Sequence, residues 1–177
     1  MNRIELCVWG REAGSGRIDI GDCVLISPGV RISASDQIVI GDGTMIANGV
    51  YITDSDWHGL YDRRQRDHRI TPVYIERNVW IGDHATVLKG VCIGENAVVA
   101  ARAVVTRNVP ANAVVAGNPA RVVKFLDRDR TMTTRMDAFA DPEAVMQYLD
   151  EFDREQLADN SLWRWLWSLI WPASVYQ

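Results

Sequence analysis

The sequence lacks the features that mark disulfide-rich, zinc-binding and membrane-spanning proteins. Its three cysteines, Cys7, Cys23 and Cys92, are widely spaced and form no CxxC pair. An odd and scattered set supports neither a disulfide framework nor a zinc ribbon. No apolar run reaches the roughly 20 residues of a membrane span, and the N-terminus has none long enough for a signal peptide. We therefore expect a cytoplasmic protein.

Neither sign of charge is in large excess. The 177 residues include 19 basic and 23 acidic side chains, which give a formal net charge of -4, and 47% of the residues are hydrophobic. A nucleic-acid partner is not expected, because proteins that bind phosphate backbones carry a basic surface. The hydrophobic fraction excludes intrinsic disorder, and the length fits one domain with an appendage.

A six-residue repeat runs through most of the chain. Six is a multiple of the two-residue strand period, so the first side chain of each hexad returns to the same face of a strand. The fifth position is small or β-branched, and the fourth is mostly glycine or asparagine, which tolerate positive φ at a tight corner. Each hexad is therefore expected to form one short strand and one turn. The first positions are Ile20, Ile26, Ile32, Ile40, Ile46, Ile52, Ile75, Ile81, Val87, Ile93, Val99 and Val105.

Each hexad, as one short edge of a coil, can bury its apolar side only when the chain winds into coils that stack on one another. Three edges per coil make a triangular prism. The repeat therefore predicts an all-β solenoid.

Two motifs make a family resemblance specific: VWIG at residues 79–82 and AGNPARVVK at residues 116–124. Together with the hexads, over residues 18–124, they resemble the maltose, galactoside and polysaccharide O-acetyltransferases of the hexapeptide-repeat family. The resemblance implies a left-handed parallel β-helix, which we expect over residues 1–124. It also implies a homotrimer that transfers acetyl from acetyl-CoA to a sugar hydroxyl in clefts between adjacent prisms. A bacterial surface polysaccharide or its precursor is the expected acceptor.

The register of the repeat is lost for about twenty residues after Ile52, and a long loop inside a compact fold is usually functional. Attack by a sugar hydroxyl needs a base near neutral pKa, which histidine supplies. The loop begins ITDSDWHG, similar to the family motif I-T-D-x-D-x-H-G, so His58 is the predicted general base of a catalytic loop. Asp54 or Asp56 is expected to orient its imidazole. Trp57 is a candidate for stacking on the sugar, with packing on the prism as the alternative.

The resemblance also places the acetyl-CoA site. Turn amides near Asp83 are expected to stabilise the thioester oxyanion, and Trp80 is expected to line the cleft. The non-glycine corner residue Arg102 departs from the family pattern, and pairing with a CoA phosphate or an acidic acceptor would explain it. The pantetheine arm is predicted to run along Ala101, with further contacts at Thr106 and Arg107, and the phosphates to meet Arg121 and Lys124.

Other functions were weighed against this interpretation. The family resemblance extends to zinc-binding carbonic anhydrases of the same fold, which need an H-x4-H pair. The histidines here, His58, His68 and His84, are ten and sixteen residues apart, so no metal is expected. An N-acyltransferase of a nucleotide-linked amino sugar and a non-catalytic scaffold remain as alternatives.

The repeat ends at Lys124, and residues 125–177 are expected to form a helical C-terminal extension. Asp141-Pro142-Glu143 is typical of a helix start. Residues 162–171 carry four tryptophans that need cover. Docking on a neighbouring subunit is favoured, because the preceding acidic segment opposes anionic lipid. Peripheral contact with the inner face of the membrane is the alternative.

Overall fold

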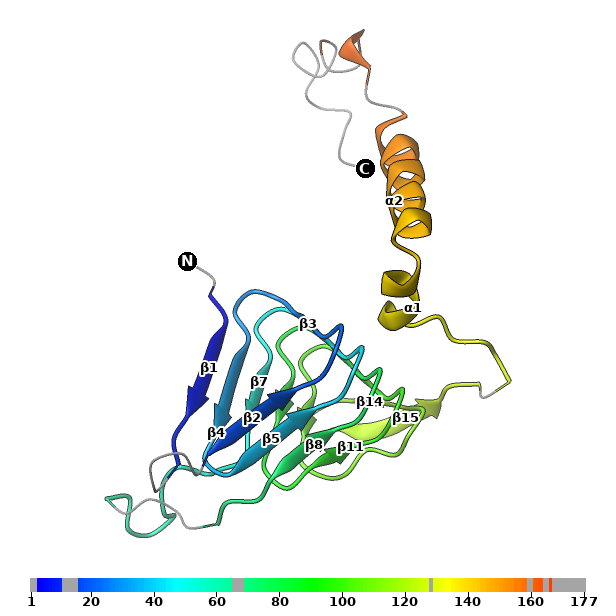
Figure 1. Ribbon diagram of the computed structural model, residues 1–177. Coiled ribbons are helices and arrows are strands. Elements are labelled where there is room, and N and C mark those ends of the chain that lie inside the picture. Colours follow the sequence, from blue (N-terminus) through cyan, green and yellow to red (C-terminus); the bar gives the residue numbers. More distant parts are fainter. Residues whose placement is uncertain are drawn as a thin grey trace. The chain divides into compact units, whose positions relative to one another are not determined.

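The computed structural model describes residues 3–10, 16–64, 69–127, 129–158, 161–163 and 166. The chain divides into two units, residues 1–136 and residues 137–177. In the first unit the chain winds repeatedly around a triangular core, so that each turn of the solenoid adds a strand to successive sheets (Figure 1). This is the parallel β-helix that the hexads predict.

Three sheets form the sides of the prism. Sheet 1 contains β1 (Glu5–Val8), β4 (Arg31–Ala34), β7 (Tyr51–Thr53), β10 (Thr86–Val87) and β13 (Val104–Val105). Sheet 2 contains β2 (Arg17–Ile20), β5 (Gln37–Ile40), β8 (Val73–Ile75) and β11 (Cys92–Ile93). Sheet 3 contains β3 (Leu25–Ile26), β6 (Met45–Ile46), β9 (Trp80–Ile81), β12 (Val98–Val99), β14 (Ala113–Ala116) and β15 (Arg121–Phe125).

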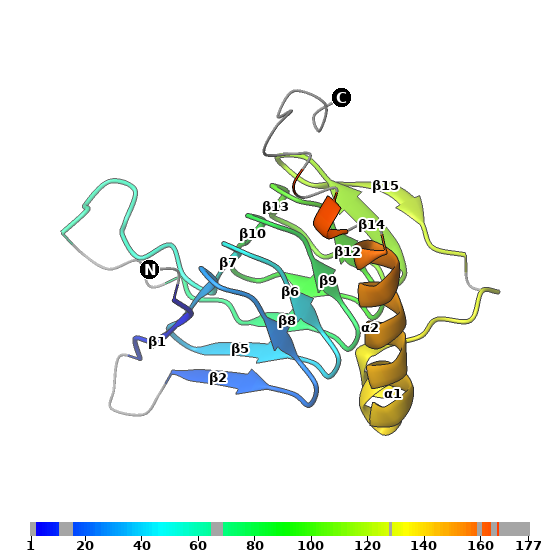
Figure 2. The same ribbon diagram turned by 90° about the horizontal axis from the view of Figure 1, so that it is seen from above.

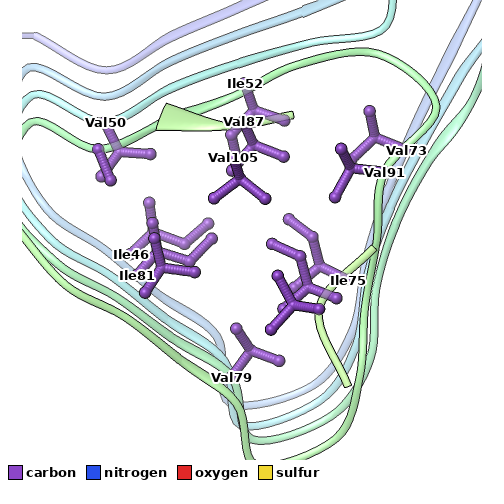
Figure 3. Packing of buried hydrophobic residues seen from close by; sticks show 14 of the residues in the cluster. Ile46, Val50, Ile52, Val73, Ile75, Val79, Ile81, Val87, Val91 and Val105 are labelled. Carbon is purple, nitrogen blue, oxygen red and sulfur yellow. The ribbon is translucent and has the colours of Figure 1, made fainter. Parts of the chain in front are cut away.

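The core consists of columns of aliphatic side chains that repeat from coil to coil. In Figure 3, Ile52, Val87 and Val105 lie one behind another, as their paired strands require. Ten of the twelve predicted first positions are buried, and the two others, Ile20 and Ile26, belong to the first coil. The regular spacing of the hexads thus places aliphatic side chains of successive coils in contact. This contact is the main source of hydrophobic stabilisation.

Turns connect the sheets at three corners. The first corner, between sheets 1 and 2, comprises residues 35–36, 54–72, 88–91 and 106–108. The second, between sheets 2 and 3, comprises residues 21–24, 41–44, 76–79, 94–97 and 110–112. The third, between sheets 3 and 1, comprises residues 27–30, 47–50, 82–85 and 100–103. Residues 117–120 continue the third corner, since Val104 N donates to Gly117 O at 3.0 Å.

Most predicted corner residues have the expected left-handed backbone. Asn78 and Asn96 have φ of 54° and 59°, and their side chains are joined by a 2.8 Å hydrogen bond. Arg102 also has a positive φ, 61°. Asn108 is an exception, because it is absent from the positive-φ residues of the described chain and its Oδ1 instead accepts from Cys92 N at 2.8 Å.

The end of the solenoid differs from a purely parallel arrangement. β15 pairs antiparallel with β14, with an irregularity between Val114 and Val115. The chain reverses at Gly117, which has a φ of 94°, and at the cis peptide bond before Pro119. Sheet 3 is therefore mixed.

Two helices follow the strands: α1 (Arg135–Ala140) and α2 (Pro142–Leu157). The Asp141 side chain caps α2 by accepting from Ala144 N at 3.0 Å, and Pro142 occupies the first turn. None of the helices in the described ranges combines the length and hydropathy of a transmembrane segment. Most of the tryptophan-rich segment lies outside the described residues, so its predicted docking is not addressed by the structure.

Candidate active site

The loop of residues 54–72 leaves the first corner between β7 and β8 (Figure 2). Its base is closed by a backbone hydrogen bond of 3.0 Å from Thr71 N to Asp54 O. Lys89, from the next coil, joins both ends of the loop. Its Nζ donates to the Asp56 carboxylate at 2.5 Å and to a carbonyl at the far end of the loop at 2.9 Å. The loop therefore has a fixed base.

His58 is exposed on this loop, with its Nδ1 3.1 Å from the Arg63 carbonyl oxygen. A carbonyl can only accept, so Nδ1 is the donor and Nε2 carries the lone pair of the neutral ring. Asp62 shapes the turn that presents this carbonyl, because its carboxylate accepts from the backbone and the guanidinium of Arg64. The hydrogen bond from Arg64 lowers the pKa of Asp62. The loop thus selects the tautomer that a general base requires.

Neither predicted acid contacts the His58 ring through its carboxylate. Asp56 is paired with Lys89, and its backbone carbonyl accepts from His58 N at 2.8 Å. The ring is oriented by a backbone carbonyl in place of a carboxylate. Every residue has a backbone carbonyl, so this partner of the ring could not be predicted from the sequence.

Asp54 holds the loop to the preceding coil. Its side chain is fully buried, and its carboxylate accepts from Ser35 N at 2.8 and 3.0 Å and from Asp36 N at 2.7 Å. Burial raises the pKa of Asp54, while the backbone N–H donors offset part of this effect. The residue is therefore placed to fix the loop start against the first-corner turn nineteen residues earlier.

We expect Asp54→Ala to lower the free energy of unfolding by about 2 to 5 kcal/mol, because each buried amide left without an acceptor costs about 1 to 3 kcal/mol. Thermal denaturation at fixed protein concentration measures the effect. Asp62→Ala, which removes an exposed carboxylate of the same loop, is the matched control and should leave the midpoint nearly unchanged. Equal midpoints for the two variants would contradict the role assigned to Asp54.

The stability effect of Asp54 should also depend on pH. Because its pKa is raised above the ordinary 3.8 in the folded protein, folding favours the protonated carboxyl. That contribution is fully present below the unfolded pKa and is lost as pH rises through the folded pKa. The stability difference between wild type and Asp54→Ala should therefore be larger at about pH 4 than at about pH 7. Chemical denaturation at both pH values provides the comparison.

An aromatic cluster fixes the residue before His58. Trp57 has a φ of 66°, which is unusual for a bulky side chain. Its Nε1 donates to the Tyr51 hydroxyl at 3.1 Å, its backbone N donates to Ser55 Oγ at 3.2 Å, and its ring meets Trp9 edge to face at 6.1 Å. Trp57 therefore packs on the prism, and these contacts determine where the loop turns toward His58.

Three predicted donor-site residues lie together on the third corner. Asp83 and Ala101 occupy successive turns, and Arg102 N donates to Asp83 O at 2.8 Å. The Asp83 carboxylate accepts from Asn48 N at 3.1 Å. In the described structure the backbone amides of Asp83 and Ala101 have no acceptor. Two unused donors on adjacent turns can bind an oxyanion or an amide carbonyl.

The other predicted donor-site residues lie elsewhere. Thr106 and Arg107 are exposed at the first corner, on the same edge of the prism as His58. Arg121 and Lys124 are exposed on β15, where Arg121 pairs with Ala116 beside the third corner. The donor-site residues thus divide between two edges of one prism.

Within one chain, His58 and Asp83 are separated by the width of sheet 1. From Gly49 at the third corner to Asp54 at the first is about 16 Å, given about 3.3 Å per strand residue. Trp80 is half-exposed on the outer side of sheet 3, beyond the third corner. A single chain therefore does not bring the predicted base and the predicted oxyanion donors together.

No group of three histidine, cysteine or carboxylate side chains in the described ranges is arranged to hold a metal ion. His68 lies outside those ranges, and His84 occupies a third-corner turn with a φ of 56°. Sequence reasoning missed Lys89 and Tyr51. Both are at hexad positions whose side chains turn outward, which is the signal that could have identified them.

The coils and the turn architecture define a hexapeptide-repeat parallel β-helix. The family model for bacterial transferase hexapeptide (six repeats) matches residues 72–107, and the one for the hexapeptide repeat of succinyl-transferase matches residues 38–54. A hexapeptide-repeat acetyltransferase from Vibrio cholerae, solved in complex with acetyl-CoA, is 32% identical with a TM-score of 0.60. That match covers 71% of this chain and 69% of the other.

A maltose O-acetyltransferase from Clostridium difficile is 30% identical with a TM-score of 0.54, over 71% of this chain and 68% of that one. Galactoside O-acetyltransferase of Escherichia coli is 37% identical over 114 residues, which are 64% of this chain and 47% of that enzyme. The chain thus spans less than half the length of this curated relative. It belongs to the hexapeptide-repeat acetyltransferase family.

Proposed function

We propose that this protein transfers an acetyl group from acetyl-CoA to a hydroxyl of a sugar. The observation that carries the proposal is the hydrogen bond between His58 Nδ1 and the Arg63 carbonyl, which leaves Nε2 as a basic nitrogen on an exposed, anchored loop. Relatives named for galactoside and maltose acetylation support a sugar acceptor. The acceptor we propose is a sugar of a bacterial surface polysaccharide or its precursor.

In the proposed reaction, the acceptor hydroxyl attacks the thioester carbonyl while His58 Nε2 takes its proton. The new carbon–oxygen bond creates a tetrahedral oxyanion, which the free amides of Asp83 and Ala101 are positioned to stabilise. Collapse of this intermediate breaks the carbon–sulfur bond. The proton held by His58 then passes to the departing thiolate of CoA. No other reactant is needed, and the base is regenerated.

The donor is proposed to lie along the edge of the prism toward β15. The exposed guanidinium of Arg121 and ammonium of Lys124 suit the CoA phosphates, because charge-assisted hydrogen bonds to phosphate are strong. Arg102, exposed one coil earlier on the third corner, adds a further cation. The residues at the first corner, Thr106 and Arg107, reach the same donor only from a neighbouring copy.

A site divided in this way needs more than one copy of the chain, and we propose a closed homotrimer. The outer side of sheet 3 carries an unbroken apolar ladder in strand register, consisting of Leu25, Met45, Trp80, Val98 and Val114. Soluble monomers seldom expose continuous apolar patches of this kind. In a cyclic assembly, this face and the adjoining third corner would meet the first corner of the next copy. We propose a left-handed, cytoplasmic trimer with three shared sites.

The proposal is tested by measuring CoA release from acetyl-CoA with a panel of neutral, acidic and amino sugars. Acceptor-dependent release, with acetyl found on a sugar oxygen, is the expected result. Transfer only to the nitrogen of amino sugars would replace the O-acetyl reading with the N-acyl alternative. Light scattering should give a mass near three times 19.9 kDa, and full activity in a monomer would overturn the shared site.

A further inference from the structure

A pocket opens on the outer side of sheet 1 across the first three coils. Its floor includes two third-corner glycines, Gly29 and Gly49, which have φ of 78° and 66°. A Cβ on Gly49 would collide with the ring of His84. The lining residues are Arg3, Glu5, Gly29, Val30, Arg31, Gly49, Val50 and Tyr51.

The charged side chains of this pocket differ in whether they have an ion-pair partner. Arg3 Nε donates to the Glu5 carboxylate at 2.8 Å, so these two charges compensate each other. Arg31 stacks on the Tyr51 ring, with its guanidinium carbon 4.2 Å from the ring centre. Among the described residues Arg31 has no carboxylate at ion-pair distance. The pocket therefore has one uncompensated guanidinium and a net charge of about +1.

A hydrogen bond links the same pocket to the residue that precedes the proposed base. The Tyr51 hydroxyl, on the ring under Arg31, accepts from Trp57 Nε1 at 3.1 Å, and Trp57 directly precedes His58. Tyr51 and Asp54 lie about 10 Å apart along the strand, at about 3.3 Å per residue. A short sugar can span such a distance. An acceptor with one end at Arg31 would have its ring directed toward the catalytic loop.

We propose that this pocket binds the carboxylate of an acidic sugar, and that the acetyl acceptor is a uronic-acid type of residue. The proposal rests on the proposed acetyl transfer and names its substrate class. The planar fork of Arg31 matches a carboxylate, and stacking on Tyr51 fixes its orientation. A single uncompensated positive charge suits a monoanion better than a phosphate dianion.

The test compares three acceptors of the same ring type: the neutral sugar, its uronic acid and its sugar phosphate. Wild type should favour the uronic acid in kcat/KM. Arg31→Gln should lower kcat/KM for the uronic acid by about 10- to 100-fold relative to the neutral sugar, as expected for a charge-assisted hydrogen bond. Arg31→Lys should recover only part of the loss, because it keeps the charge without the fork.

Arg17→Gln is the matched control, since Arg17 is an exposed arginine on sheet 2 that pairs with Asp19. It should preserve the preference. Calorimetric titration of the uronic acid into wild type and Arg31→Gln measures the pocket without any turnover. Equal binding by the two proteins, or a preference for the sugar phosphate, overturns the pocket assignment. Absence of transfer from wild type to every acceptor overturns the proposed function, whereas transfer without preference for acids overturns only the acidic acceptor.

Discussion

Replacing His58 with alanine should lower kcat by about 10²- to 10⁴-fold, which is the usual contribution of a general base. The affinity for acetyl-CoA should change little, because the residues proposed to bind the donor lie on other turns and on β15. Single-turnover and steady-state measurements with saturating acetyl-CoA separate these two quantities.

His84→Asn is the control for this experiment. His84 is also an exposed histidine in a turn, and asparagine tolerates its φ of 56°. Turnover by His84→Asn should stay close to that of wild type. Unchanged turnover in His58→Ala, or a comparable loss in His84→Asn, would move the base away from the loop.

Mixing two inactive variants should restore activity if each site is shared between copies. His58→Ala removes the base from the first corner, and Ala101→Phe fills the proposed donor groove on the third corner. In a randomly mixed ring, about one quarter of the sites would combine an intact loop from one copy with an intact corner from the next. Activity should therefore rise from near zero to about a quarter of the wild-type value in the unsorted mixture, and to about one third in purified mixed rings of three, where one site is intact.

The mixture is prepared by co-expression with two different affinity tags, so that mixed rings can be purified. A double variant carrying both changes in one chain, mixed with wild type, provides the matched control for subunit exchange. Failure of the tagged mixed rings to regain activity would show that the base and the donor groove work within a single chain.

The repeat predicted the solenoid because each hexad determines its own strand and turn, independently of distant residues. A hexad with isoleucine or valine at the first position specifies an inward side chain wherever it occurs, and the buried column of Ile52, Val87 and Val105 follows directly. The antiparallel β15 could not be predicted in this way. The pairing of β15 with β14 depends on a chain reversal at Gly117 and Pro119 that has no periodic signature.

The contacts that position His58 were predicted only in part. The loop motif identified the histidine, but its partner is the backbone carbonyl of Arg63, and every residue has such a group. Asp54 was interpreted as a possible catalytic acid because it is near His58 in the sequence. The structure points its carboxylate to amides of the previous coil, a contact that a single hexad does not encode.

The sequence spacing alone could have predicted that the donor-site residues divide between two edges of the prism. Three hexads complete a coil, so residues eighteen positions apart in uninterrupted coils share a corner. His84 and Arg102 satisfy this rule, and both have left-handed backbones on the third corner. Thr106 is only four residues beyond Arg102 and therefore falls on the next corner. Counting by eighteen would have placed Thr106 and Arg107 on a different corner from Ala101 and Arg102.

The first coil has a consequence for how the solenoid comes apart. Leu6 and Val8 are in register with the fully buried Ile32 and Ala34, yet they remain about half exposed on β1, the edge strand of sheet 1 among the described residues. Each coil contacts only the neighbouring coils, so the stability of the prism is that of a one-dimensional chain of coupled units. We therefore expect the solenoid to open more readily at this N-terminal end of the described prism than in its middle. The pocket under Arg31 lies nearest that end, whereas the His58 loop is anchored further inside.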